Sequence, residues 1–198
     1  MSIRIIVPHR GLAAAKTRLA TILHPDERMK LAERLLRSVL AVARQACDDV
    51  VVISPSIELE PMVSAAGARL VAQHGMGLNA GLEEARAAAL AEGVTTLIVL
   101  HGDLPNLGTG DIQALLDALP VPAGVVIAPD RAGAGTNALA MQPADAIGFR
   151  FGIGSHAAHR AAAEAGGLPF VDLARPGLAF DLDTPDDLAR WIELGDAA

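Results

Sequence analysis

The sequence predicts an α/β domain in which a mostly parallel sheet carries helices on both faces. Short runs of β-branched and apolar residues alternate with longer segments whose apolar residues recur at helical spacing. Several of the short runs are apolar at every position, which is typical of strands buried on both faces. Hydrophobic residues make up 52% of the chain but aromatic residues only 3%, so we expect a core of Ala, Val, Leu and Ile between sheet and helices.

Length, charge and cysteine content narrow the class of protein. A chain of 198 residues is long enough for one sizeable core, and no linker or repeat divides it, so we expect a single domain over residues 1–198. The net charge of −7 argues against nucleic-acid and anionic-membrane partners. No run approaches the ~20 apolar residues of a membrane span. Cys47 is the only cysteine, which excludes an intramolecular disulfide framework and fits a reducing cytoplasm.

In the first half of the chain, apolar runs and glycines mark where elements begin and end. The predicted strands are at 3–7, 49–54 and 69–73, and the predicted helices are at 25–44, at 58–66 and from Asn79 to Glu92. The long helix begins with Pro25 and two acids in its first turn, as stable helix starts do. Gly67 and Gly93 follow the shorter helices as stop signals.

The second half repeats the alternation. Strands are predicted at 95–100, 123–128 and 138–141, helices at 109–119 and 157–165, and short sheet segments near Val171 and at 179–183. Thr184 and Pro185 predict a last helix whose Leu188, Trp191 and Ile192 pack inward.

The stretch Thr95-Thr96-Leu97-Ile98-Val99-Leu100-His101-Gly102-Asp103-Leu104-Pro105 predicts a central buried strand that ends at a carboxylate. Ligands of open α/β sheets bind at the carboxyl ends of the strands, so Asp103 stands where a ligand or metal is expected. The alternative is that Asp103 only caps the helix that follows.

The loop after the first strand combines glycine with cations. Gly11 is followed by a predicted helix start, and Arg10, Lys16 and Arg18 could offset phosphate charge there. The loop lacks the second glycine of the Gly-x-x-x-x-Gly-Lys-Ser/Thr motif, so a solvated basic loop is the alternative.

Two further glycine-containing segments precede predicted helices. Gly77 and Asn79 could let a flat ring lie against backbone while the amide reads its edge, although Asn79 could instead be a helix N-cap. Gly152, Gly154 and Ser155 could form a small anion nest, with a plain Ser cap as the alternative. His156 and His159 have a spacing that metal ligands can use, but without a third ligand nearby a surface pair is favoured.

Asp181 and Asp183 form a second acidic strand end. Alternate residues of a strand point the same way, so these two carboxylates should project together while Leu182 faces the core. With Asp103 they make a set of oxygen ligands that suits Mg²⁺ beside phosphates. Two anion sites with a metal between them meet the requirements of nucleotidyl transfer, in which one phosphate attacks another and no side chain need be the nucleophile.

Along essentially its whole length the sequence resembles the guanylyltransferases of coenzyme F420 biosynthesis. The motifs that carry the resemblance are, in order, Val-Pro-x-x-x-Leu-x-x-x-Lys-Thr-Arg-Leu, Gly-Leu-Asn-Ala, Asp-Leu-Pro, Ala-Pro-Asp-Arg-x-Gly-x-Gly-Thr-Asn-Ala-Leu, Phe-Gly-x-Gly-Ser-x-x-x-His and Gly-Leu-x-x-Asp-x-Asp-Thr-Pro-x-Asp-Leu. Together they are highly specific, although none is specific alone.

The resemblance implies a Rossmann-like nucleotidyltransferase fold and an enzyme that joins GTP to a three-carbon phosphorylated acid with release of pyrophosphate. The acid would be phosphoenolpyruvate, 2-phospho-L-lactate or 3-phosphoglycerate. The resemblance implies that Mg²⁺ is bound by Asp103, Asp181 and Asp183, and that Lys16 and Asp103 are the catalytic residues. The phospho acid would be bound by Thr136, Gly152, Ser155, Arg10 and Arg18. The GTP would be bound by Gly11, Lys16, Gly77 and Asn79.

The sequence departs from the family's usual pattern at His9, Arg10 and His101, so the resemblance leaves the acid open. Two alternatives to this activity are a transferase of the same fold that uses molybdopterin or a sugar phosphate, and a non-catalytic GTP-binding module. The first lacks support because the Gly-Gly-x-Gly-x-Arg loop is absent, and a binding module would have little use for three carboxylates. The expected partners are therefore GTP and a small phospho acid, with a homodimer left open.

Overall fold

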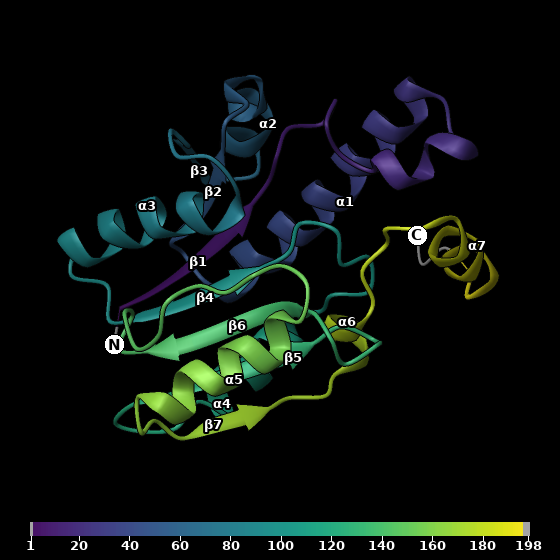
Figure 1. Ribbon diagram of the computed structural model, residues 1–198. Coiled ribbons are helices and arrows are strands. Elements are labelled where there is room, and N and C mark those ends of the chain that lie inside the picture. Colours follow the sequence, from purple (N-terminus) through teal and green to yellow (C-terminus); the bar gives the residue numbers. More distant parts are fainter. Residues whose placement is uncertain (1, 196–198) are drawn as a thin grey trace.

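The computed structural model describes residues 2–195, which form a seven-stranded sheet covered by helices (Figure 1). The strands are β1 (Ile3–Pro8), β2 (Val50–Ser54), β3 (Arg69–Ala72), β4 (Thr96–Leu100), β5 (Gly124–Pro129), β6 (Thr136–Gln142) and β7 (Phe170–Asp172). The α-helices are α1 (Pro25–Ala46), α2 (Glu60–Ala65), α3 (Leu78–Ala91), α4 (Thr109–Asp117), α5 (Ser155–Ala165), α6 (Pro176–Ala179) and α7 (Pro185–Glu193). Two 3₁₀ helices, η1 (Thr17–Thr21) and η2 (Ile57–Leu59), complete the described chain.

The sheet has the strand order β3-β2-β1-β4-β6-β5-β7 and confirms the predicted mostly parallel α/β class. Neighbours are parallel throughout the β3-β2-β1-β4 half and between β5 and β7. Only β6 runs the other way, antiparallel to both β4 and β5. The start of β6 therefore lies beside the end of β4, so residues from both positions meet at one edge of the sheet.

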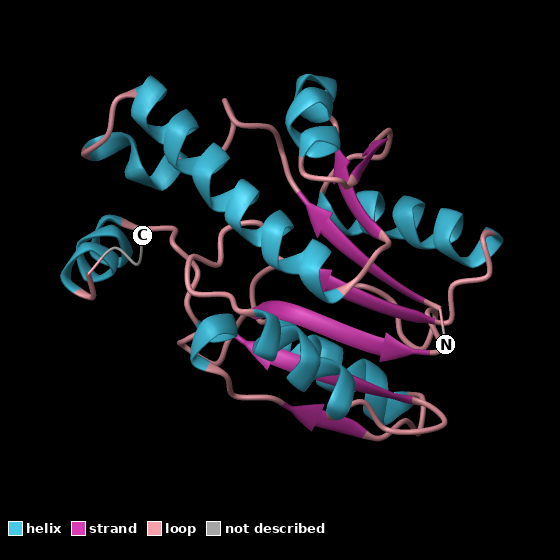
Figure 2. Cartoon of the chain, turned by 180° about the vertical axis from the view of Figure 1, so that it is seen from behind, coloured by secondary structure: helices cyan, strands magenta, loops and turns pink. Residues whose placement is uncertain are grey.

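Helices cover both faces, as the alternating pattern predicts. One apolar cluster packs α1, α2, α4 and α6 against the side chains of one face, and a second packs α3 and α5 against the other. Figure 1 shows α3 and α5 in front of the sheet. Figure 2 views the molecule from the opposite side and shows the long α1 crossing that face of the sheet. Leu19, Leu35 and Trp191 belong to a third, smaller cluster that seats η1 and α7 beside α1.

The C-terminal segment differs from its predicted strand. Residues 180–183 form no strand, because α6 turns the chain away from β7 and brings it past the loop that follows β4. The alternation of inward and outward residues survives: Leu182 is buried between Asp181 and Asp183. Trp191 of α7 packs inward as predicted, but Ile192 is 62% exposed, so its inward placement is wrong.

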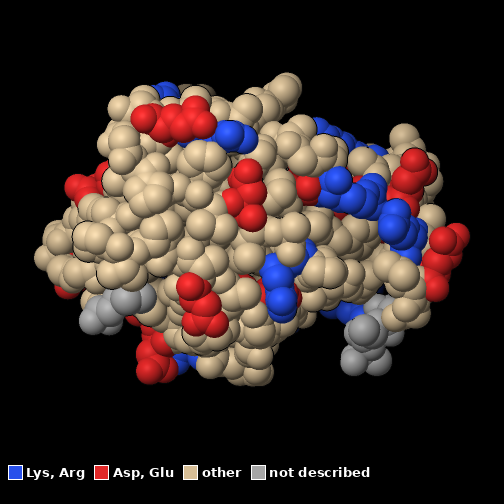
Figure 3. All heavy atoms as spheres, turned by 90° about the horizontal axis from the view of Figure 1, so that it is seen from below, with Lys and Arg blue, Asp and Glu red and all other residues tan. Residues whose placement is uncertain are grey.

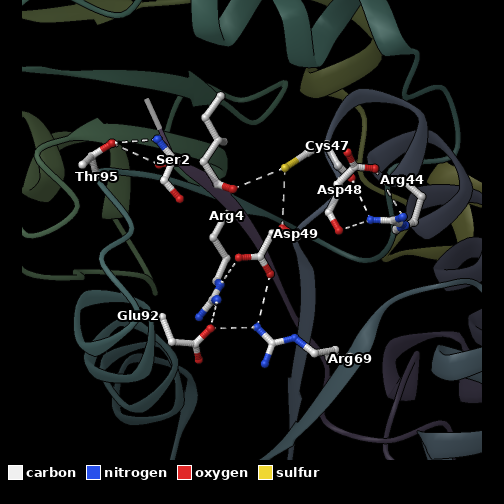
Figure 4. A network of polar contacts seen from close by, with 10 residues as sticks. Ser2, Arg4, Arg44, Cys47, Asp48, Asp49, Arg69, Glu92 and Thr95 are labelled. Carbon is white, nitrogen blue, oxygen red and sulfur yellow. Dashed lines mark hydrogen bonds and ion pairs between the residues drawn. The ribbon is translucent and has the colours of Figure 1, made fainter.

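A network of four charged residues ties the opposite edge of the sheet together (Figure 4). The buried Arg4 at the start of β1 contacts Asp49 at 2.7 Å and Glu92 at 2.6 Å. Arg69 of β3 contacts the same two carboxylates at 3.3 and 3.4 Å. Each charge faces opposite charge, so the network fixes the amino ends of three strands and the end of α3 without a buried unpaired ion.

Among the residues described, no helix is both long and apolar enough to cross a bilayer. On the face shown in Figure 3, basic side chains stand beside acidic ones and uncharged residues cover most of the area.

Candidate active site

A pocket of about 480 Å³ lies at the carboxyl ends of β1 and β4. The loop after β1, the Gly102-Asp103 turn after β4, the start of α3 at Gly77 and the C-terminal Asp183 line it. Because β1 and β4 are parallel neighbours, the segments that follow them meet at this edge, which is where α/β sheets bind ligands.

Lys16 lies at the centre of the charged residues in this pocket. Its side chain is only 4% exposed, and its ammonium contacts Asp103 Oδ2 at 2.6 Å and Asp183 Oδ1 at 3.1 Å. Burial alone would lower the pKa of Lys16, but the two carboxylates outweigh burial and hold the pKa above its ordinary value. The backbone of Lys16 is left-handed, with φ 53° and ψ 34°. This conformation is energetically unfavourable for residues other than glycine and is found most often at functional sites. Lys16 is therefore not part of a solvated basic loop.

Asp103 lies in the turn three residues after β4 ends, as predicted, and does not cap a helix. The next helix, α4, begins at Thr109 with Gly108 as its N-cap. Burial opposes ionisation of Asp103, but Lys16, followed by His101 and His9, outweighs burial and lowers the pKa of the carboxyl. The second oxygen, Oδ1, is buried and has no hydrogen-bond partner. Asp103 is thus ionised with one oxygen still available.

The predicted acidic pair lies next to Asp103. The N–H of Leu182 donates to the carbonyl oxygen of Asp103 at 3.1 Å, which places Asp181 and Asp183 on either side of this contact. Asp181 accepts a hydrogen bond from Asn137 Nδ2 at 3.2 Å. Burial and the nearby Asp103 raise the pKa of Asp181.

The three carboxylates have the donor chemistry for a hard cation, but the present arrangement is not a finished metal cage. Among residues 2–195, no three acidic, histidine or cysteine side chains are grouped closely enough to hold a metal ion. The cation between Asp103 and Asp183 is the Lys16 ammonium. The partnerless Oδ1 of Asp103 and the raised pKa of Asp181 both indicate acceptors that a further cation would satisfy.

The remaining residues of the first loop surround the same pocket. Gly11 donates its N–H to His9 Nδ1 at 3.0 Å, and burial lowers the pKa of His9 to about 4 despite the nearby Asp103. Arg10 and Arg18 are exposed and line the pocket, and Arg18 reaches Asp183 at 3.5 Å. The loop therefore supplies one buried and two solvent-facing cations.

Asn79 is neither the N-cap of α3, which is Gly77, nor a free amide. Its Nδ2 donates to the carbonyl oxygen of Phe151 at 3.0 Å, and its Oδ1 accepts the N–H of Phe151 at 2.9 Å. Each end of the amide makes one hydrogen bond here, so these two bonds fix the orientation of the Asn79 side chain. In this structure Asn79 ties α3 to the second glycine-rich turn.

That second turn precedes α5 and faces the start of β6. Gly152 has φ 131° and Gly154 has φ 71°, values that residues with a side chain rarely adopt. Gly154 is the N-cap of α5, so Ser155 is not the cap. Its Oγ instead lies 3.2 Å from Thr136 Oγ1, and both hydroxyls are buried. The structure brings together Thr136, Gly152 and Ser155, which were predicted to bind a phospho acid. Arg10 and Arg18, predicted for the same site, line the pocket of the first loop instead.

The prediction that His156 and His159 form a surface pair is wrong. His159 is fully buried and its Nδ1 lies 3.1 Å from Thr136 Oγ1, whereas His156 contacts Asp172 at 2.7 Å. The two rings diverge because their places on α5 face the sheet and its edge respectively.

Two site residues received no role from the sequence. Asn137 donates to the carbonyl oxygen of Leu178 at 3.0 Å as well as to Asp181, so it holds the C-terminal segment against β6. A polar residue at the start of an otherwise apolar strand was the available signal. His159 gave the same kind of signal as a polar position on the buried face of α5.

Comparison with known families gives a match over nearly the whole chain. Residues 3–197 match the family model described as guanylyl transferase CofC like. A phosphoenolpyruvate guanylyltransferase from Sphaerobacter thermophilus is 45% identical over 185 residues, covering 92% of this chain and 89% of the relative. The protein of the same name from Rubrobacter xylanophilus is 43% identical, with 96% and 93% covered. A 3-phospho-D-glycerate guanylyltransferase from Phenylobacterium zucineum is 36% identical, with 92% and 86% covered.

Solved structures show the same fold at low sequence identity. A candidate nucleotide-diphospho-sugar transferase from Desulfovibrio desulfuricans has a TM-score of 0.81 and 19% identity, covering all of this chain and 90% of that one. The synthetase of CMP-2-keto-3-deoxy-manno-octonic acid, solved with CTP, has a TM-score of 0.60 and 15% identity, with 98% of both chains covered.

Proposed function

Because the chain belongs to the guanylyl transferase CofC-like family, we propose that it joins GTP to the phosphate of a three-carbon acid and releases pyrophosphate. The relatives at 45% and 43% identity carry the name phosphoenolpyruvate guanylyltransferase, so phosphoenolpyruvate is the first acid to test. A relative named for 3-phospho-D-glycerate makes that acid the second, and 2-phospho-L-lactate is the third. The product would enter coenzyme F420 biosynthesis.

The observation that supports this proposal most is the position of the charged residues between two anion-binding segments. Lys16, Asp103 and Asp183 line the pocket formed by the loop after β1. Asn137 connects the neighbouring Asp181 to the strand that begins with Thr136. We assign the triphosphate to the first segment, where Gly11, Lys16 and Gly77 line or adjoin the pocket. Its charge would be offset by Lys16, Arg10 and Arg18.

The phospho acid is assigned to the turn at Gly152–Ser155. The hydroxyls of Thr136 and Ser155 and the N-terminal end of α5 offer hydrogen-bond donors and a positive helix end to a phosphate. A phosphate bound there would be linked to the carboxylates through Thr136, whose neighbour Asn137 contacts Asp181.

In the proposed reaction an oxygen of the acid's phosphate attacks the α-phosphorus of GTP. A new phosphorus–oxygen bond forms as the bond from the α-phosphorus to the bridging oxygen breaks, and the electron pair leaves with pyrophosphate. Both reacting groups come from the substrates, so the protein's contribution is to align them and to offset their negative charge.

We further propose that Asp103, Asp181 and Asp183 hold Mg²⁺, which would neutralise phosphate charge where the two substrates meet. Support comes from the partnerless buried Oδ1 of Asp103 and from the raised pKa of Asp181. The cation would compete with the Lys16 ammonium for Asp103 and Asp183. Lys16 would then be available to the phosphates.

The deciding experiment measures pyrophosphate release with GTP or ATP, with or without Mg²⁺, and with each of the three acids in turn. The downstream deazaflavin acceptor is included in case the product is short-lived. We expect turnover with GTP, Mg²⁺ and one acid. Equal turnover with ATP would remove the guanylyl assignment, and no turnover with any acid would contradict the proposal as a whole. Molybdopterin or sugar-phosphate acceptors in the same assay test the other transferase activities.

A further inference from the structure

The buried side chains of Ser155, Thr136 and His159 form a hydrogen-bonded network beside the second glycine-rich turn. Ser155 Oγ lies 3.2 Å from Thr136 Oγ1, and Thr136 Oγ1 lies 3.1 Å from His159 Nδ1. All three residues are at most 2% exposed. The proposed function uses the two hydroxyls but gives the imidazole no task.

The position of the hydrogen on His159 follows from its neighbours. The backbone N–H of Arg150 points to Nε2 at 2.9 Å, and because an amide N–H can only donate, Nε2 must carry no hydrogen. The Phe151 ring packs against the imidazole in a T-shaped contact with 4.8 Å between centroids, and burial lowers the pKa of His159 to about 4. The ring is therefore neutral, and its one hydrogen is on Nδ1.

This tautomer decides how many hydroxyl hydrogens remain for a ligand. With Nδ1–H donating to Thr136 Oγ1, the two hydroxyls make one hydrogen bond to each other, which uses one of their two hydrogens. If Ser155 is the donor, the Thr136 hydrogen remains; if Thr136 is the donor, the Ser155 hydrogen remains. In the opposite tautomer Thr136 would donate to Nδ1 and Ser155 to Thr136, and no hydrogen would remain.

A phosphate dianion only accepts hydrogen bonds, so it requires the remaining hydrogen. We propose that His159 is a positioning residue for the acceptor substrate: its Nδ1–H keeps one hydroxyl hydrogen of the Thr136–Ser155 pair free for the phosphate of the acid. The inference rests on the proposed placement of the acid at Gly152–Ser155. It adds a residue that contacts no substrate but sets the direction of the hydrogen bonds that do.

The His159 ring also positions the backbone of the turn. Its Nε2 accepts the N–H of Arg150, and both backbone groups of the next residue, Phe151, hydrogen-bond to the Asn79 amide. The two backbone contacts immediately precede Gly152. His159 thus links the orientation of the hydroxyls to the position of the turn above them.

The first test reads the tautomer directly in the wild-type protein. Long-range ¹H–¹⁵N spectra of the imidazole rings distinguish Nδ1–H from Nε2–H, and the His159 signals are identified by their loss in His159→Phe. We expect the neutral Nδ1–H form. A ring with its hydrogen on Nε2 would overturn the proposal whatever the kinetics show.

The second test separates the KM for the acid from the KM for GTP. His159→Phe keeps an aromatic ring and removes both nitrogens, and we expect the KM for the acid to rise about tenfold or more, the range of a hydrogen bond to a charged group, with the KM for GTP unchanged. His159→Asn can place an amide N–H where Nδ1–H was and should recover part of the loss. The matched control is His156→Ala on the same helix, which breaks only the contact with Asp172 and should change neither KM.

The outcomes distinguish this inference from the proposed function. A wild-type protein that releases no pyrophosphate with any acid would remove the proposed function, and with it the acid that the inference places at this turn. An active wild type whose acid KM is unchanged in His159→Phe, or raised equally with the KM for GTP, would overturn the role of His159 alone. Equal KM values in His159→Asn and His159→Phe would do the same. If His159→Phe does not fold, the loss of signals in His159→Asn identifies the His159 ring instead, and the wild-type tautomer and the KM values of the Asn variant still decide.

Discussion

Replacing Lys16 by alanine should destabilise the protein substantially, because it removes the one cation from between two carboxylates. Removal of one partner of a fully buried ion pair costs about 3 to 5 kcal/mol, whereas an exposed pair contributes about 0 to 1. The Lys16 side chain is 4% exposed, but Asp103 is 25% and Asp183 39% exposed, so water screens the second pair more than the first. Asp103 can also take up a proton once the ammonium is gone, which limits the loss. We therefore expect Lys16→Ala to lower the free energy of unfolding by about 3 kcal/mol.

For a chain of this length, about 3 kcal/mol corresponds to a fall in Tm of roughly 6 to 12 °C. The assay is thermal unfolding followed by circular dichroism, at neutral pH and with a chelator present. Lys16→Gly should be about 1 kcal/mol less destabilised than Lys16→Ala, because glycine adopts the left-handed backbone at position 16 without strain. Adding Mg²⁺ should raise the Tm of Lys16→Ala by more than that of the wild type, since the ammonium no longer competes for the carboxylates.

The matched control is Arg18→Ala. Arg18 also contacts Asp183, but it is 72% exposed and the contact is 3.5 Å, so its removal should change Tm very little. If Lys16→Ala melted with the wild type, the ammonium would contribute nothing to stability and the account of the charged cluster would be refuted. An equal loss in Arg18→Ala would show that net charge, not position, sets the effect.

Three further predictions concern other residues of the site. Asp103→Asn and Asp183→Asn should keep the circular dichroism spectrum and abolish turnover; wild-type rates in both at saturating Mg²⁺ would place the metal elsewhere. Ser155→Ala should raise the KM for the acid by roughly 10- to 150-fold, and a rise in the KM for GTP instead would assign the turn to the triphosphate. The pKa of His159 is about 4, below the ordinary 6.5, so its contribution to stability is complete above pH 6.5 and is lost as the pH falls toward 4. Between pH 6.5 and pH 4, the free energy of unfolding measured with urea should fall by about 3 kcal/mol more in the wild type than in His159→Phe, because phenylalanine cannot titrate. If the free energies of both proteins fell in parallel with pH, the lowered pKa of His159 would be contradicted.

The sequence predicted those parts of the fold that depend on local pattern. The continuous apolar runs of β1 and β4 identify buried strands, and the turn after β4 lies at the carboxyl edge of the sheet wherever the other strands lie. Asp103 and Lys16 could therefore be placed at a common site before any contact was known. Their distance of 2.6 Å could not, since it depends on the left-handed turn at Lys16.

The parts that sequence could not predict depend on distant partners. Nothing in residues 136–142 states that β6 runs antiparallel, yet this direction brings Thr136 beside the end of β4. From its local sequence, Asn79 could be a helix cap or a residue that recognises a base. In the structure both ends of its amide hydrogen-bond to the backbone of Phe151, 72 residues later. The local sequence predicts that His159 lies on the surface, but in the structure it is buried against Thr136, 23 residues earlier. Local propensity carries no information about such contacts.

The contact between Lys16 and Asp183 has a consequence for how the protein is made. The two residues are 167 positions apart, so at about 5 to 20 residues per second the ribosome makes Asp183 roughly 10 to 30 s after Lys16. All seven strands precede Asp181 and Asp183 in the chain, so the residues of the sheet are synthesised before the residues that complete the site. A chain released early, after residue 175, would hold the strands and Asp103 but lack two of the three carboxylates. The emerging protein therefore becomes competent only when its last segment docks.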